Sequence, residues 1–353
     1  MILFTAVFIV ITLLCLTGLF FQEKIEEKFP KVDVLILISS ITFGLLWVIA
    51  GFREGVGTDY YPYMDYFYKT EVYTLFNNPF EWGFYYLNKI LNIATGNPRF
   101  IFLVVSFIIL FVINEALLKF SPNYYLSILL FINLYFYFNS LNIMRQFIAV
   151  AIIFYSIKYI YERDLKKFTI SIIIASLFHL TSLFFWFMYF IVQRKYKLFI
   201  YIFGIMFSFL FVFLFPYIVN FLVVFMPRYQ SYLTNMFTES SSNSVILIIS
   251  TTLVFAYVLF RNKEWERKNI ILFNLVYIGL ILNIAASFNF LFYRISIYFY
   301  IFVILLIPQL IEMVDKRYQN WVSAAIVSVT LVYCIYLLYS GNGEILPYRF
   351  SFF

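Results

Sequence analysis

Charged side chains are scarce in this chain of 353 residues: Lys, Arg, Asp and Glu make up 12% of it, and apolar residues make up 64%. Soluble domains carry about 25% charged residues, so the composition excludes that class. Apolar runs of about 18 to 25 residues recur from end to end, and each can cross a hydrocarbon core of about 30 Å. We therefore predict an all-α, polytopic integral membrane protein with a single transmembrane domain over residues 1–353.

Residues that bind metals or exchange electrons are also scarce. The two cysteines, Cys15 and Cys334, lie inside apolar runs and show no metal or redox spacing. A cation that holds a diphosphate usually needs paired carboxylates, and the acidic pair Glu264 and Glu266, which has that spacing, lies in a basic inner connection. We expect a site without metal or cofactor. In a membrane protein an excess of basic residues mainly sets the orientation in the bilayer. The net charge of +7 is therefore no sign of a nucleic-acid partner, and we expect none.

The apolar segments pose a problem of topology. If every segment crossed the membrane, the short basic connections 163–167 and 193–197 would lie on opposite sides, which the positive-inside rule disfavours. Segment 168–192 has a polar break at its middle, His179-Leu180-Thr181-Ser182, so we predict that it is a re-entrant helical hairpin. Such backbone is tolerated at membrane depth only where protein or a wet cavity surrounds it. The prediction is about 10 transmembrane helices plus this hairpin, with both termini outside, and the candidate spans are 2–21, 32–52, 100–118, 124–140, 145–162, 168–192, 198–226, 245–261, 269–287, 294–311 and 321–340.

In this topology the two basic residue types separate. The short lysine-bearing connections fall inside, whereas the arginines at or beyond the outer ends of helices are Arg53, Arg99, Arg145, Arg228, Arg294 and Arg349. Arginine binds phosphate or carboxylate with two fixed N–H groups, which lysine cannot do. An arginine that only snorkels to the interface costs about 1 kcal/mol or less, so that role is the alternative for each of them.

The outer connection 53–99 concentrates polar residues. It opens with the stretch 53–65, and we predict a short interfacial helix after Asn78-Pro79. Asp59 and Glu81 stand near glycine and tyrosine residues at the predicted membrane surface. Both are candidate acid–base groups, although a carboxylate in an outer loop is usually only solvated. A second outer connection, 227–244, is rich in serine and asparagine.

Three helix ends carry the candidate anion site. Arg145 opens the span 145–162 beside an amide, and a helix N-terminus already favours an anion. Arg294 opens the span 294–311, and Arg53 follows the span 32–52. We predict that these three arginines meet on one diphosphate. His179, the only histidine, is a candidate base, with a purely structural role as the alternative.

Taken in order along the chain, these motifs resemble the EpsG/Wzy-like family of exopolysaccharide repeat-unit polymerases. The matching pieces are Arg53, Gly57-Thr58-Asp59-Tyr60, Glu81-Trp82-Gly83-Phe84, Arg145-Gln146, Ala149, Lys167-Phe168, Phe178-His179-Leu180-Thr181-Ser182, Tyr293-Arg294 and Tyr298. The resemblance implies transfer of a growing glycan from undecaprenyl diphosphate to the non-reducing end of a lipid-linked oligosaccharide repeat unit, at the outer face of the bacterial cytoplasmic membrane. It also implies that neither a nucleotide sugar nor a metal takes part. GT-C-type glycosyltransferase folds are candidate relatives, and a flippase and a chain-length regulator are candidate partners.

For such a reaction we assign hypothetical roles to the residues above. Arg53, Arg145 and Arg294 would bind the departing diphosphate, where negative charge develops. His179, Asp59 or Glu81 would take the proton of the attacking sugar hydroxyl. The residues expected to contact the substrate are Tyr60, Trp82, Gln146 and Tyr293.

Two other classes of function stay open. The first is a transporter, such as a flippase, because a hairpin with a polar tip also forms substrate sites in transporters. Internal symmetry is common in transporters, and this sequence shows no internal symmetry. A different lipid-linked transferase, such as a glycan ligase or an acyltransferase, is the second class. Acyl transfer would be favoured by a histidine with a neighbouring acid on the outer face, and no acid lies within several residues of His179.

Overall fold

The computed structural model describes residues 2–28, 33–74, 77–225, 265–286 and 290–351. Within these ranges every regular element is a helix, and the one isolated β-bridge pairs Arg53 with Phe350. The predicted all-α fold is confirmed. Among the described residues seven helices are long and apolar enough to cross a membrane, or eight if one bent pair forms a single span, so the polytopic class is confirmed as well.

The spans fall close to their predicted places. The candidate crossings are α1 (Ile2–Lys28), α2 (Val34–Gly51), α5 (Arg99–Phe120), α11 (Leu198–Phe225), α14 (Arg267–Ala286), α15 (Phe290–Tyr300) continued by α16 (Val303–Glu312), and α17 (Lys316–Tyr339). Helix α8 (Met144–Tyr161) occupies the predicted span 145–162. The predicted connection 227–244 with Arg228 and the predicted span 245–261 lie outside the described residues, so the total of about ten crossings stays a prediction.

The predicted span 124–140 is a bent pair of helices. Helix α6 (Tyr124–Asn133) and helix α7 (Phe136–Asn142) meet at an angle of 52°. Tyr135 at the bend has a φ of 71°, a left-handed conformation that non-glycine residues seldom adopt. Its hydroxyl donates a hydrogen bond of 2.7 Å to the carbonyl of Asn342, which holds the bend against the C-terminal segment.

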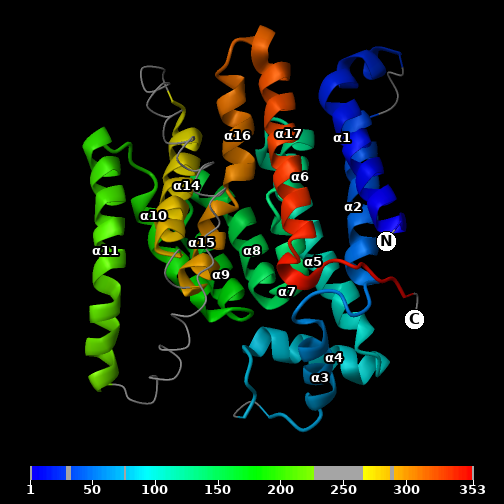
Figure 1. Cartoon of the computed structure of the whole chain (residues 1–353), viewed down its shortest axis with the longest axis vertical. Coiled ribbons are helices and arrows are strands. Elements are labelled where there is room, and N and C mark those ends of the chain that lie inside the picture. The colour runs from blue at the N-terminus through cyan, green and yellow to red at the C-terminus, as the bar shows by residue number, and fades with distance from the viewer. Residues whose placement is uncertain (1, 29–32, 75–76, 226–264, 287–289, 352–353) are drawn as a thin grey trace. The chain divides into compact units, whose positions relative to one another are not determined.

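The described helices divide into two compact units. The first comprises residues 1–186 and 307–353, and the second comprises residues 187–306. In the first unit α2 packs against α1 and α5, α8 against α5 and α9 (Leu165–Ser176), and α6 against α1 and α17 (Figure 1). In the second unit α14 packs against α11 and α15. The single transmembrane domain stays a prediction.

Segment 168–192 turns back on itself where the sequence predicts a break. Helix α9 ends at Ser176, and the chain resumes as a 3-10 helix, η1 (Leu180–Phe187), that runs into α10 (Met188–Ile191). The indole Nε1 of Trp186 donates a hydrogen bond of 2.9 Å to Oγ1 of Thr169, so the second arm lies beside the first. The chain therefore forms a hairpin with its tip at residues 177–179. Its re-entrant position in a bilayer stays a prediction.

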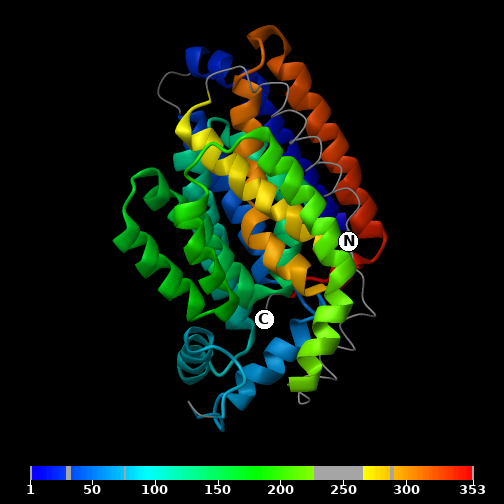
Figure 2. The same ribbon diagram turned by 90° about the vertical axis from the view of Figure 1, so that its left-hand side faces the viewer.

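The outer connection folds into two helices, α3 (Tyr60–Lys69) and α4 (Trp82–Thr95), which lie together at one end of the first unit (Figures 1 and 2). Helix α4 begins later than the Asn78-Pro79 motif suggests. The reason is that Oδ1 of Asn78 accepts hydrogen bonds from the Tyr66 hydroxyl (2.6 Å) and the Phe80 amide (3.2 Å), which fixes a turn before the helix.

Candidate functional site

The carboxylate of Glu81 joins two of the other predicted site residues. Its Oε2 atom lies 2.5 Å from Nη1 of Arg145, and its Oε1 atom lies 3.2 Å from Nδ1 of His179. Oε1 also accepts a hydrogen bond of 3.2 Å from the amide of Leu180. Residues from the outer connection, the start of α8 and the hairpin tip thus meet at one point, all within the first unit.

Arg145 is held on several sides. It sits in the first turn of α8, where the helix dipole and the unpaired N–H groups favour an anion. Its guanidinium lies 3.8 Å from the ring centroid of Phe80, a cation–π contact. The buried Tyr63 on α3 lies beside Arg145 as well, and the charge of Arg145 partly offsets burial, which raises the pKa of Tyr63. The Nε atom of Arg145 is buried and finds no acceptor among the described residues.

A glycine sets the distance between α4 and the hairpin tip. The Gly83 amide donates a hydrogen bond of 2.7 Å to the carbonyl of Leu177, at the turn between the two arms. A Cβ atom on residue 83 would lie 2.7 Å from that same oxygen, so a side chain would push the two segments apart. Only glycine permits this approach. The contact places Glu81, two residues earlier, against His179.

The two partners of Glu81 keep its carboxylate ionised. Burial alone would raise the pKa of Glu81, but the close approach of His179 and the charge of Arg145 outweigh that effect and lower the pKa to about 2. Both carboxylate oxygens are engaged, so Glu81 is suited to orient its neighbours rather than to take a proton. Glu81 and Arg145 keep 20% exposure and His179 keeps 16%, which leaves the cluster within reach of a substrate.

Arg53 occupies a different environment. Its side chain is buried, and its Nη1 and Nη2 atoms donate to the carbonyls of Ala50 (3.0 Å) and Leu141 (2.7 Å). The guanidinium lies 4.7 Å from the ring centroid of Phe102, and Tyr60 stacks on the same ring at 4.4 Å. Arg53 therefore ties the end of α2 to α5 and to the end of α7, which uses two of its three guanidinium nitrogens.

The other predicted site residues are dispersed. Asp59 directly precedes α3 and is partly exposed, Trp82 is exposed at the start of α4, and Gln146 is buried next to Arg145. Tyr293 and Arg294 lie on α15, in the second unit. Their part in the site stays a prediction.

Two residues at the site were not predicted, namely Tyr63 and Phe80, which contact Arg145. The available signal for Tyr63 was spacing, because Tyr60, Tyr63 and Phe67 share one buried face of α3. Phe80 gave no signal, since it precedes its helix.

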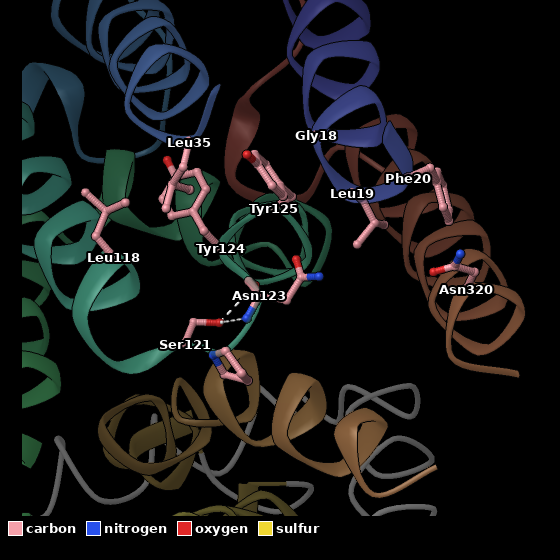
Figure 3. A pocket seen from close by; sticks show the side chains of 11 residues that line it. Gly18, Leu19, Phe20, Leu35, Leu118, Ser121, Asn123, Tyr124, Tyr125 and Asn320 are labelled. Atoms are coloured by element: carbon pink, nitrogen blue, oxygen red, sulfur yellow. Dashed lines mark hydrogen bonds between the residues drawn. The ribbon is translucent and has the colours of Figure 1, made fainter. Parts of the chain in front are cut away.

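A separate cavity of about 450 Å³ lies at the opposite ends of the helices of the first unit (Figure 3). Its walls come from the end of α1, the starts of α2, α6 and α17, and the end of α5. Its lining includes the amides of Asn123 and Asn320 and the ring of Tyr125, and none of its lining residues is a carboxylate, histidine, lysine or arginine. It therefore lacks a group for acid–base chemistry near neutral pH, unlike the Glu81 cluster.

The candidate site lies inside a region matched by a known family. In the described part of the chain, no group of three or more His, Cys, Asp or Glu residues is placed to hold a metal. The model of the EpsG family matches residues 36–350, which include Glu81, Arg145 and His179. Neither a curated protein nor a solved structure gives a match.

Proposed function

This chain belongs to the EpsG family, and from that premise we propose that it is a metal-independent polysaccharide polymerase of the bacterial cytoplasmic membrane, with its site on the outer face. Membership of the family points to a polymerase-type function in exopolysaccharide synthesis. The finer proposal is that it transfers a glycan chain from undecaprenyl diphosphate to the non-reducing end of a lipid-linked repeat unit. Its candidate protein partners are a flippase and a chain-length regulator.

The proposed reaction uses three side chains. A hydroxyl oxygen of the acceptor sugar attacks the anomeric carbon of the donor glycan, and the bond from that carbon to the diphosphate oxygen breaks. The hydroxyl proton passes to Nε2 of His179, while Nδ1 faces Oε1 of Glu81, 3.2 Å away. The departing diphosphate keeps the electron pair, and its charge is met by Arg145 and the N-terminus of α8.

One observation carries this proposal: Glu81 contacts Arg145 and His179 at once. The ionised carboxylate selects the tautomer of His179 that has a free Nε2, and it stabilises the imidazolium that forms when the proton arrives. The same carboxylate holds Arg145 in place, so the proton acceptor and the diphosphate site are positioned by one group.

The remaining residues take supporting roles in the proposal. Trp82, exposed at the start of α4, is suited to stack on a sugar face. Asp59, Tyr60 and Gln146 form part of the surroundings of the site in this proposal. Tyr60 and Gln146 are both buried. We assign Arg53 to positioning α7 and α8, because backbone carbonyls occupy its guanidinium.

Substitution of Arg145 in polymer-forming cells tests the proposal. Arg145→Ala should abolish long polymer, and Arg145→Lys should shorten it, because lysine offers a point charge without the two-pronged geometry. Arg99→Lys is the matched control, since Arg99 also stands at an outer helix start but pairs with the exposed Glu54. Chain lengths are read from gels of the extracted polysaccharide. Wild-type lengths from both Arg145 variants would refute the role of Arg145.

A second candidate is acyl transfer, because the contact between Glu81 and His179 supplies the acid that the sequence around His179 lacks. The two candidates use the same base but different donors. Purified protein given an acyl donor and a lipid-linked sugar would yield an acylated sugar and no lengthened glycan if the second candidate were correct.

A further inference from the structure

An apolar groove opens on the first unit, and none of its lining residues belongs to the Glu81 cluster. It has a volume of about 440 Å³, with walls from α1 and α17 and a floor from α6 and α7. Both wall helices are candidate membrane spans, and little of either span is buried within the protein. Ile9 on α1 and Ile335 on α17 line the groove and are 54% and 46% exposed. In a bilayer such a groove is filled by hydrocarbon.

Polar side chains in the groove use their hydrogen bonds inside the protein. The Thr12 hydroxyl donates to the carbonyl of Phe8 (2.8 Å) within α1. The Asn133 amide donates to the Thr330 hydroxyl (3.3 Å), and Cys334 lies 3.8 Å from the carbonyl of Ile132. These contacts join α6 to α17 and present little polarity to a ligand. The groove therefore suits a hydrocarbon chain and not a polar headgroup.

The floor of the groove leads towards the proposed diphosphate site. Phe138, in the floor, lies on α7, and α8 with Arg145 begins directly after that helix. Only the end of α7, at Asn142, and the non-helical Ile143 lie along the chain between Phe138 and the start of α8. Phe8 packs on Phe138 with ring centroids 5.4 Å apart, which fixes α1 to this end of the floor.

From this continuity we propose that the groove between α1 and α17 holds the isoprenoid chain of a lipid-linked substrate while its diphosphate lies at Arg145. The inference rests on the proposed function, because that function supplies the lipid. An ordinary phospholipid has no headgroup site at Arg145 in this scheme, so it would enter the groove without the second contact. The isoprenoid diphosphate gains both contacts and should displace phospholipid.

Photolabelling tests the groove without any need for turnover. The full protein is placed in phosphatidylglycerol liposomes with a long-chain isoprenyl diphosphate that carries a diazirine in its chain, and labelled peptides are mapped by mass spectrometry. We expect label on residues 4–13 and 331–339, removed by excess unlabelled isoprenyl diphosphate. Ile335→Trp and Ile9→Trp should lower this label about tenfold, the effect of displacing two methylene groups. Val332→Trp and Val10→Trp, which are exposed on the same helices but do not line the groove, should leave it unchanged.

Each outcome separates the two proposals. Label spread equally over groove and control positions, or wild-type label in Ile335→Trp and Ile9→Trp alike, would overturn the groove. Persistence of the label under excess unlabelled isoprenyl diphosphate would mark adventitious insertion, and would overturn it too. If the label follows the prediction while no glycan is lengthened in a polymerase assay, the groove stands and the proposed polymerase function fails.

Discussion

Replacement of Glu81 by glutamine should impair the protein more than replacement of any other outer carboxylate of the described chain. The change keeps the shape of the side chain and removes its charge. In the folded protein the pKa of Glu81 falls from 4.5 to about 2, so its partners favour the ionised form by about 3 kcal/mol. Loss of one partner from a buried ion pair costs about 3 to 5 kcal/mol. Because Glu81 keeps 20% exposure, we expect Glu81→Gln to lower the free energy of unfolding by about 2 to 3 kcal/mol.

The effect on catalysis should be larger than the effect on stability. Without the carboxylate, His179 loses its preferred tautomer and the stabilisation of its protonated form, so polymer formation per folded molecule should fall about 100- to 10,000-fold. The measurement is the rate at which purified protein lengthens a lipid-linked oligosaccharide, normalised to folded protein from a melting curve in detergent.

Glu54→Gln is the matched control. Glu54 lies in the same outer connection and pairs with Arg99 at 3.1 Å, but it is 46% exposed, and exposed pairs contribute up to about 1 kcal/mol. We expect near wild-type polymer formation from Glu54→Gln. Equal rates from Glu81→Gln and Glu54→Gln would refute the reasoning about Glu81.

Three further predictions follow from the same contacts. Gly83→Ala should separate α4 from the carbonyl of Leu177 and reduce polymer yield, whereas Gly44→Ala, with open space around residue 44, should leave the yield unchanged. Arg53→Lys should lower the melting temperature in detergent, by leaving a carbonyl unpaired at a cost of about 1 to 3 kcal/mol, without altering substrate affinity. The folded pKa of Glu81 is depressed, so its stabilising effect is complete above pH 4.5 and is lost as the pH falls to about 2; denaturation curves of wild-type protein should show this loss, and curves of Glu81→Gln should not.

Local signals in the sequence predict the helices and several members of the site. The polar break at His179 marks the hairpin tip because the residues around it interrupt a long apolar run, and the chain does turn there. Arg145 is conspicuous in the sequence because it is a charged residue at the end of an apolar helix, where a charge costs free energy unless it snorkels or binds an anion. Both signals depend on a few neighbouring residues, so they can be read directly from the sequence.

Contacts between distant segments are not predictable in this way. Glu81 and Arg145 are 64 residues apart, and their pairing depends on the approach of Gly83 to Leu177. No glycine or proline marks the bend between α6 and α7 in the sequence. The left-handed conformation of Tyr135 at the bend is held instead by a contact with the C-terminal segment. The contacts of Arg53 and Arg145 differ for the same reason. Both are outer arginines in the sequence, and only the packing shows that Arg53 is bound to backbone carbonyls whereas Arg145 is paired with the carboxylate of Glu81.

The most direct test of the central claim is a reconstituted reaction. Purified protein in liposomes receives a synthetic isoprenyl diphosphate oligosaccharide as both donor and acceptor, with a chelator and no nucleotide sugar, and products are resolved by mass spectrometry. We predict a ladder of glycans that differ by one repeat unit, with one isoprenyl diphosphate released for each new linkage, and no ladder from His179→Gln. A ladder of wild-type length from His179→Gln, or no lengthened product from the wild-type protein, would contradict the account.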